Sequence, residues 1–140
     1  MDTDRSYQQA SAIPYRRDED RLEYCLITAS GSGRWGFPKG LIDPGDSFLE
    51  TALKESQEEA GLFGRIVGPP IGEYEYRKWG SDLQVIVVLM EVSRFDREWE
   101  EDDVRERRWA DFEDALELIC RPTLRELLER AHDRLCAEAN

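Results

Sequence analysis

A turn followed by a strongly predicted helix near the middle of the chain constrains the fold more than any other feature. The Asp43-Pro44-Gly45 segment has the chemistry of a turn. Ser47, followed three residues later by Glu50, forms a capping-box pattern, and Gly61 is typical of a helix end. We therefore expect a helix from about residue 47 to residue 60. Its small and apolar residues share one arc, which we expect to face a core: Leu49, Ala52, Leu53, Ser56 and Ala60.

Three glutamates share a second arc of the same helix. At about 100° per residue, Glu55, Glu58 and Glu59 lie close together, so their carboxylates repel one another. A hard divalent cation prefers oxygen ligands and would remove this repulsion. A solvated acidic face is the alternative, because the chain has 31 acidic residues. The glycine-containing turn ahead of the glutamates favours a magnesium or manganese site that acts on a polyphosphate.

The same segment resembles the Nudix box, a long motif that begins with a glycine and ends in Arg-Glu-aliphatic-any-Glu-Glu-any-Gly-aliphatic. A motif of this length rarely matches by chance. The matching positions run from the opening glycine to the closing pair: Gly40, Asp46, Lys54, Glu55, Glu58, Glu59, Gly61 and Leu62.

Three positions depart from the motif. Asp46 replaces a glutamate, Lys54 replaces an arginine and Ser56 replaces an aliphatic residue. We expect Asp46 and Lys54 to face each other and pair, since a lysine can reach one oxygen of a shorter acid. Ser56 is expected to donate a hydrogen bond to a carbonyl one turn earlier in the helix.

The resemblance implies an α/β/α sandwich with a mixed sheet, and attack by water on a phosphorus of a pyrophosphate linkage. Metal ions, Mg²⁺ or Mn²⁺, would neutralise charge on the phosphate oxygens. The implied metal ligands are the Gly40 carbonyl and the carboxylates of Glu55, Glu58 and Glu59, with Lys54 beside them as a further catalytic residue.

The identity of the proton acceptor is left open by the resemblance. Glu55 is one candidate, and family members can also bring an acid from a loop beyond the box. Here Glu100 or Glu101, in the acidic run that ends at Asp103, could supply this acid. A solvated loop is nevertheless the favoured interpretation of that run.

Within the family, most of the chain looks similar to diadenosine polyphosphate and diphosphoinositol polyphosphate hydrolases. The similarity is carried by the stretch from Glu91 to Ala115 and by the Trp-Gly-Phe-Pro-Lys-Gly lead-in, which also resembles RNA pyrophosphohydrolases more loosely. Gln8, Gln9 and Ala10 occupy a region that is basic in the inositol-directed members, so a diadenosine polyphosphate is the favoured substrate.

The alternatives are a diphosphoinositol polyphosphate, an RNA 5′-triphosphate, or a non-catalytic ligand-binding module. The crowded carboxylates favour an enzyme over such a module.

A net charge of −12 argues against duplex nucleic acid as a partner, because lysines and arginines supply most of that affinity. The same charge would repel a small polyphosphate, which must be met by metal ions and local cations. Lys39 is the strongest candidate for a phosphate contact because it adjoins the box glycine. Arg77 and Lys78 are further candidate substrate ligands. For these two and for the cluster of Arg105, Arg107 and Arg108, ordinary solvated charges are the simpler interpretation.

A single domain is expected over residues 10–140, preceded by a loose arm at residues 1–9. The arm lacks the apolar region of a secretion signal, and no apolar run is long enough to span a membrane. The three cysteines, Cys25, Cys120 and Cys136, are odd in number and lack metal-ligand spacing. We therefore expect a reduced, cytoplasmic protein.

The remaining elements follow from periodicity. Strands are expected at about residues 10–15, 22–29, 64–76 with a break at Pro69-Pro70, 82–92 and 105–110, and helices at 112–119 and 122–137. The apolar stripe of the last helix should contact the core: Leu124, Leu127, Leu128, Ala131 and Leu135. His132 is expected to pack or lie at the surface and not to catalyse.

Overall fold

Seven strands and three helices make up the described part of the chain, residues 8–78 and 80–138 of a computed structural model. The strands are β1 (Gln9–Asp18), β2 (Arg21–Thr28), β3 (Trp35–Gly36), β4 (Lys39–Leu41), β5 (Leu62–Lys78), β6 (Ser81–Phe95) and β7 (Arg107–Ala110). The helices are α1 (Phe48–Ala60), α2 (Phe112–Leu118) and α3 (Pro122–Glu138).

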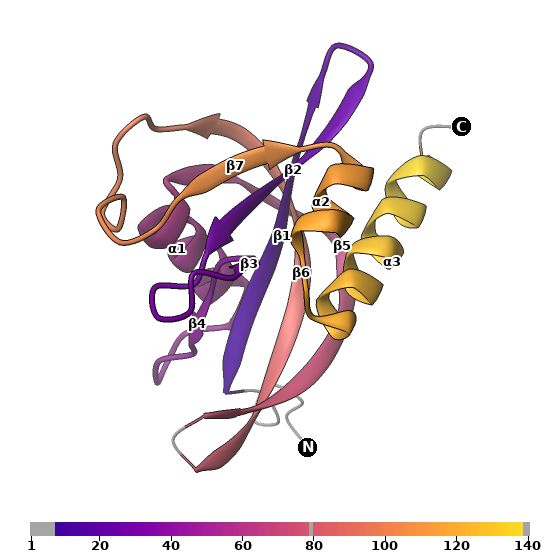
Figure 1. The fold of residues 1–140 in the computed structure, drawn as a ribbon. Coiled ribbons are helices and arrows are strands. Elements are labelled where there is room, and N and C mark those ends of the chain that lie inside the picture. The colour runs from indigo at the N-terminus through magenta and orange to yellow at the C-terminus, as the bar shows by residue number, and fades with distance from the viewer. Residues whose placement is uncertain (1–7, 79, 139–140) are drawn as a thin grey trace.

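The strands form one mixed sheet with the order β3-β2-β1-β6-β5, to which β4 adds beside β1 and β7 beside β2. β1 pairs with β6 in parallel, whereas the β1–β2 and β5–β6 pairs are antiparallel. Helix α1 lies on one side of this sheet, and α2 and α3 lie on the other (Figure 1). The predicted three-layer arrangement with a mixed sheet is therefore confirmed.

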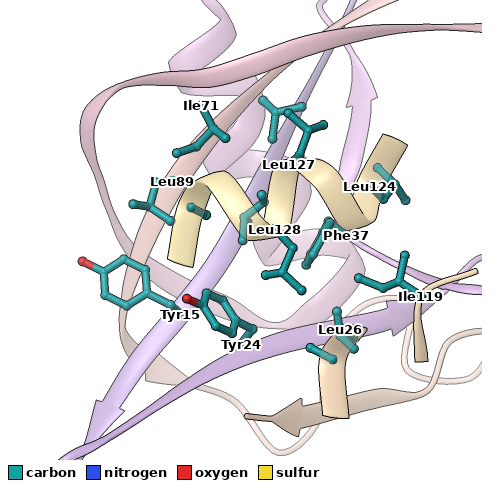
Figure 2. Close-up of a cluster of buried hydrophobic side chains, with 14 of the residues drawn as sticks. Tyr15, Tyr24, Leu26, Phe37, Ile71, Leu89, Ile119, Leu124, Leu127 and Leu128 are labelled. Carbon is teal, nitrogen blue, oxygen red and sulfur yellow. The ribbon is translucent and has the colours of Figure 1, made fainter. Parts of the chain in front are cut away.

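The central strand β6 shows how both faces of the sheet are filled. Val85, Val87 and Leu89 belong to the core beneath α2 and α3, and the residues between them belong to the core beneath α1. Because both faces of β6 are covered, its sequence is a continuous run of apolar residues and does not alternate between apolar and polar ones. Leu124, Leu127 and Leu128 of α3 belong to the first of these cores, together with Tyr24 and Leu26 of β2 (Figure 2).

Helix α1 begins and ends where the capping signals predicted. Ser47 accepts a hydrogen bond from the Glu50 amide, Glu50 accepts one from the Ser47 amide, and Gly61 closes the helix in the left-handed region at φ 65°. The prediction for Leu49 was wrong, since this residue is 42% exposed. The helix is rotated so that Thr51 and Glu59 face inward with the small residues of the predicted arc, and Leu49 is left at the edge.

Several strand boundaries differ from the sequence-based expectations, and so does the break expected within β5. Gln9 is the first residue of β1 and is buried, so the last position assigned to the loose arm belongs to the sheet, while residues 1–7 lie outside the described part. β5 continues through Pro69-Pro70 because a register shift between Val67 and Gly72 accommodates the prolines. Arg134 of α3 donates to both proline carbonyls there.

His132 has a packing role, as expected. Its Nδ1 atom is hydrogen-bonded to the Tyr24 hydroxyl at 2.8 Å, and its ring stacks on Phe112. All five residues of the predicted α3 stripe are buried. None of the described helices combines the length and the apolar character needed to span a membrane.

Candidate active site

The second half of α1 places two of its glutamates in a cleft of about 570 Å³. Glu55 and Glu59 line this cleft on one side, and the segment that contains β3 and β4 lines it on another. Glu58 is half-buried on the same helix and is absent from the cleft lining as the structure describes it. The helix therefore supplies two carboxylates directly to the cleft and keeps a third beside them.

Gly40 allows the closest approach in this region. Ala10 of β1 pairs with Gly40 of β4, and the Cα atom of Gly40 faces the side chain of Glu55. A Cβ atom at residue 40 would overlap the Glu55 carboxyl group, so any larger residue would push that group aside. The box glycine is needed here because a backbone must pass next to a functional side chain.

Glu59 is held by groups from two other parts of the chain. Its Oε1 atom accepts a hydrogen bond of 3.0 Å from the Lys39 amide. Its Oε2 atom pairs with Arg105 Nη2 at 3.1 Å, and both side chains are almost buried. The Arg105 Nε atom pairs with Glu101 at 2.7 Å, which brings a loop carboxylate to the same cluster. The earlier interpretation of Arg105 as a solvated charge was therefore wrong, because folding brings acids to it that lie far away in the sequence.

Burial gives both cleft carboxyls an unusual affinity for protons. Burial raises the pKa of Glu55 to about 7, and the Glu59 and Glu58 carboxylates add to this effect. Burial also raises the pKa of Glu59 to about 7, although Arg105 and the Lys39 amide act in the opposite direction. Two carboxyls that exchange protons near neutral pH suit proton transfer to or from water.

A loop between β6 and β7, residues 96–106, closes over the C-terminal end of α1. Trp99 Nε1 donates to the Glu59 carbonyl at 2.8 Å, and the Glu101 amide donates to the Glu58 carbonyl at 3.2 Å. Arg107 Nη1 donates to the Ala60 carbonyl at 2.7 Å. These bonds satisfy the last carbonyls of the helix and fix the glutamate-bearing turn against the loop.

The donor set of the site fits Mg²⁺ or Mn²⁺. The carboxylates of Glu55, Glu58 and Glu59 and the carbonyl of Gly40 are hard oxygen ligands, and Gly40 has no side chain that would push the Glu55 carboxyl group aside. Within the part of the chain that the structure describes, no three acidic, histidine or cysteine side chains converge as a complete metal-binding group. Glu59 is instead engaged by Arg105 and by the Lys39 amide.

The predicted pairing of Lys54 with Asp46 is wrong. Lys54 Nζ lies 3.1 Å from Oδ2 of Asp43, at the start of the turn, and this pair is exposed to solvent. Asp46 instead donates its backbone amide to the Asp43 carbonyl. The turn brings the Asp43 carboxylate within reach of Lys54, 11 residues further along the chain. Ser56, in contrast, donates to the Ala52 carbonyl at 2.8 Å, as predicted.

Two of the three candidate substrate ligands lie at the cleft, and the third does not. Lys39 and Lys78 line the cleft. Arg77 does not line it, and forms an ion pair with Asp82 across the β5–β6 hairpin. Of the two candidate loop acids, Glu101 reaches the cluster through Arg105, whereas Glu100 is exposed.

Several cleft residues were not identified from the sequence. They come from segments that only folding brings together: Arg34, Trp35, Phe37, Tyr74, Arg121 and Leu124. Trp35 and Phe37 belong to the lead-in of the box, whose resemblance to hydrolases could have identified them. Arg121, between two helices far along the chain, carries no such signal.

Comparisons with known proteins identify the family of this chain. The chain matches the family model described as NUDIX domain over residues 7–131. It is 34% identical over 127 residues to the bis(5′-nucleosyl)-tetraphosphatase [asymmetrical] of Sus scrofa, covering 87% of this chain and 86% of that protein. It is 34% identical to the mitochondrial Nudix hydrolase 13 of Arabidopsis thaliana, covering 80% of this chain and 66% of that protein.

A likeness in fold accompanies these sequence matches. The structure is similar to a solved C. elegans Ap4A hydrolase, with a TM-score of 0.78 at 22% identity, covering 91% of this chain and 96% of the other. The extent of the family match and the identity to the tetraphosphatase lead to one conclusion. The chain belongs to the Nudix family and is a pyrophosphohydrolase that acts on phosphoanhydride bonds.

Proposed function

We propose that this protein hydrolyses dinucleoside polyphosphates, with diadenosine tetraphosphate as the preferred substrate and Mg²⁺ or Mn²⁺ as the cofactor. The similar proteins from Sus scrofa, Rattus norvegicus and Mus musculus all carry the name bis(5′-nucleosyl)-tetraphosphatase [asymmetrical], at 32–34% identity. Asymmetrical cleavage of a dinucleoside tetraphosphate gives a nucleoside monophosphate and a nucleoside triphosphate. The metal belongs to the proposal because the family generally uses a divalent cation and the donor set at α1 fits one.

One observation carries the proposal, namely that a single cleft combines acids, cations and aromatic rings. Glu55 and Glu59 lie at α1, and Lys39 and Lys78 line the same cleft. The aromatic residues Trp35, Phe37 and Tyr74 are also part of its lining. A chain of phosphates needs the cations, and a purine base needs flat apolar surface, so a nucleotide polyphosphate suits the whole lining.

The chain's own residues have separate roles in this reaction. A water molecule attacks phosphorus, the phosphoanhydride bond breaks, and the leaving phosphate takes the bond electrons. Glu55 lines the cleft and faces Gly40, and we assign to it the proton of the attacking water. Lys39 would face the phosphates. A bound divalent cation would supply charge neutralisation at the phosphate oxygens.

A neutral strand beside the box disfavours an inositol substrate. Gln9 and Ala10 of β1 pair with Leu41 and Gly40 of β4, and Gln9 and Ser11 line the cleft. A ligand with phosphates all around its ring would need cations at this edge. Diphosphoinositol polyphosphates are therefore the second candidate, and RNA 5′-triphosphates the third.

A substrate panel tests the proposal. Diadenosine tetraphosphate, a diphosphoinositol polyphosphate, triphosphorylated RNA, a nucleotide sugar and ATP are incubated separately with Mg²⁺ or Mn²⁺, and the products are separated by ion-exchange chromatography. We expect the highest kcat/KM for diadenosine tetraphosphate, with AMP and ATP as products and ¹⁸O from labelled water in one of them. A higher kcat/KM for another member of the panel would reject the proposed substrate.

Two matched variants show whether turnover belongs to this site. Glu55→Gln removes a cleft carboxylate and should abolish most of the activity. Glu117→Gln makes the same chemical change at an exposed position on α2 and should leave activity unchanged. Binding of all panel members without turnover would instead support a ligand-binding module.

A further inference from the structure

Arg105 uses all three of its guanidinium nitrogens within the protein. Nη2 pairs with Glu59 at 3.1 Å, Nε pairs with Glu101 at 2.7 Å, and Nη1 donates to the Thr28 carbonyl at 3.0 Å. The side chain is only 14% exposed although it lines the cleft. An arginine that is nearly buried and bonded through each of its three nitrogens is held in one geometry, unlike a mobile surface cation.

These bonds join three segments that are far apart in the sequence. Glu59 lies on α1, Thr28 ends β2, and Glu101 lies in the loop of residues 96–106. The backbone supports the same junction, because the Glu106 amide donates to Thr28 Oγ1 at 2.9 Å and the Thr28 amide donates to the Glu106 carbonyl at 3.1 Å. The loop is therefore attached to β2 beside Arg105 and to α1 through Glu101.

Arg105 also balances the negative charge of the two carboxylates at this junction. Glu59 is buried and faces other carboxylates on α1, and Glu101 brings a further negative charge to the same place. Removing the arginine from such a set would take away the ion-pair partner that the two carboxylates share, and they would separate. The loop acid would then move away from the cleft.

We propose that Arg105 is a positioning residue for the hydrolytic reaction. Its guanidinium holds the carboxylates of Glu59 and Glu101 at fixed positions, so that a loop acid joins the carboxylate set of α1. In this proposal Arg105 acts through these two acids and not as a phosphate ligand, because each of its three nitrogens already has a partner within the protein. The planar fork is essential, since it reaches two carboxylates at once where a lysine reaches one.

The test compares Arg105→Lys and Arg105→Gln with Arg108→Gln, which removes an exposed arginine of β7. The first measurement is kcat and KM with a polyphosphate that the wild type hydrolyses. We expect Arg105→Lys to lower kcat by about 10- to 100-fold with little change in KM, although the positive charge is retained. Arg105→Gln should lower kcat at least as much, and Arg108→Gln should match the wild type.

The second measurement needs no substrate and is the affinity for Mn²⁺ alone, followed by electron paramagnetic resonance. We expect Arg105→Lys to weaken Mn²⁺ binding by about tenfold, because Glu59 loses its fixed position. Arg108→Gln should bind Mn²⁺ as the wild type does. This measurement separates the role of Arg105 from the identity of the substrate, so its failure would not affect the proposed function.

Three results would overturn the proposal. A raised KM with unchanged kcat would make Arg105 a phosphate ligand. Full activity and Mn²⁺ affinity in Arg105→Lys would show that charge alone matters, and equal losses in Arg108→Gln would show that the effect is unspecific. If Arg105→Gln does not fold, Glu101→Gln decides, since it breaks the same bridge from the loop side at a partly exposed residue. Wild-type kcat and Mn²⁺ affinity in Glu101→Gln would reject the role of the bridge.

Discussion

The two cleft glutamates show how neighbours change the chemistry of a common side chain. Glu55 and Glu59 differ little in sequence context, yet each meets a different set of groups in the fold. Glu55 faces Gly40 and the other carboxylates, whereas Glu59 meets Arg105 and the Lys39 amide. Both are buried enough to bind a proton more strongly than a solvated carboxyl does.

We predict that Glu59→Gln lowers kcat by at least about a hundredfold while the protein stays folded. Glutamine keeps the size of the side chain and can still accept from the Lys39 amide, but it carries no charge toward a cation or toward Arg105. Steady-state kinetics with Mg²⁺ and a circular dichroism spectrum check this. Near-normal turnover in a folded Glu59→Gln variant would remove the residue from the mechanism.

A second prediction concerns stability against pH in the presence of a chelator. The pKa of both cleft carboxyls is about 7 in the folded chain, above the ordinary value of 4.5, so the folded state binds more protons between these pH values. Their contribution to stability is thus present below pH 4.5 and is lost as pH rises through 7. Glu55→Gln removes one of these groups, so its melting temperature should rise relative to the wild type as pH increases. A constant difference across this range would show that Glu55 is not perturbed.

Lys54 offers a third prediction, because its partner is Asp43 and not the box acid Asp46. Its pKa is raised by the hydrogen bond with Asp43. Lys54→Ala should have no further effect on melting temperature in an Asp43→Ala background, since the pair is already lost. In an Asp46→Ala background the two changes should be additive. Additive effects with Asp43→Ala, together with no further effect of Lys54→Ala in the Asp46→Ala background, would instead support the Lys54–Asp46 pair expected from the motif.

Among the secondary-structure elements, the C-terminal end of α1 depends most on a single backbone conformation. Gly61 has φ 65°, and a Cβ atom there would lie 2.7 Å from the Cβ atom of Trp99. We predict that Gly61→Ala destabilises the protein by about 1–3 kcal/mol, since it combines backbone strain with a clash against the loop. Urea unfolding measures this. Gly45→Ala, at φ 91° in open space, is the control for backbone strain without a clash and should cost less.

For the molecule as a whole, we predict that a chelator abolishes activity and that Mg²⁺ or Mn²⁺ restores it. Cation binding to the folded state should also raise the melting temperature in proportion to the logarithm of its concentration, because the unfolded chain lacks the assembled ligands. Activity assays and thermal melts in metal-free buffer test both effects. Full activity after exhaustive chelation would exclude a metal-dependent reaction.

Local signals were enough for the parts of the fold that depend on near neighbours. The capping box and the closing glycine predicted α1 to within one residue, and the leucine spacing predicted the buried stripe of α3. Predictions failed where distant segments decide the outcome. Leu49 is exposed because the sheet sets the rotation of α1, and Lys54 pairs with Asp43 because the turn sets which acid is near.

The sequence by itself determined the family, the glutamate-bearing helix and the box glycine, because these depend on spacing along one short segment. Only the tertiary structure decided what surrounds them. Arg105 reaches Glu59 from 46 residues away, and the cleft is joined by Tyr74 of β5 and by Arg121 from the segment between α2 and α3. A charge has the same appearance in a sequence whether it is solvated or buried, since desolvation and pairing arise only when the chain brings the partners together.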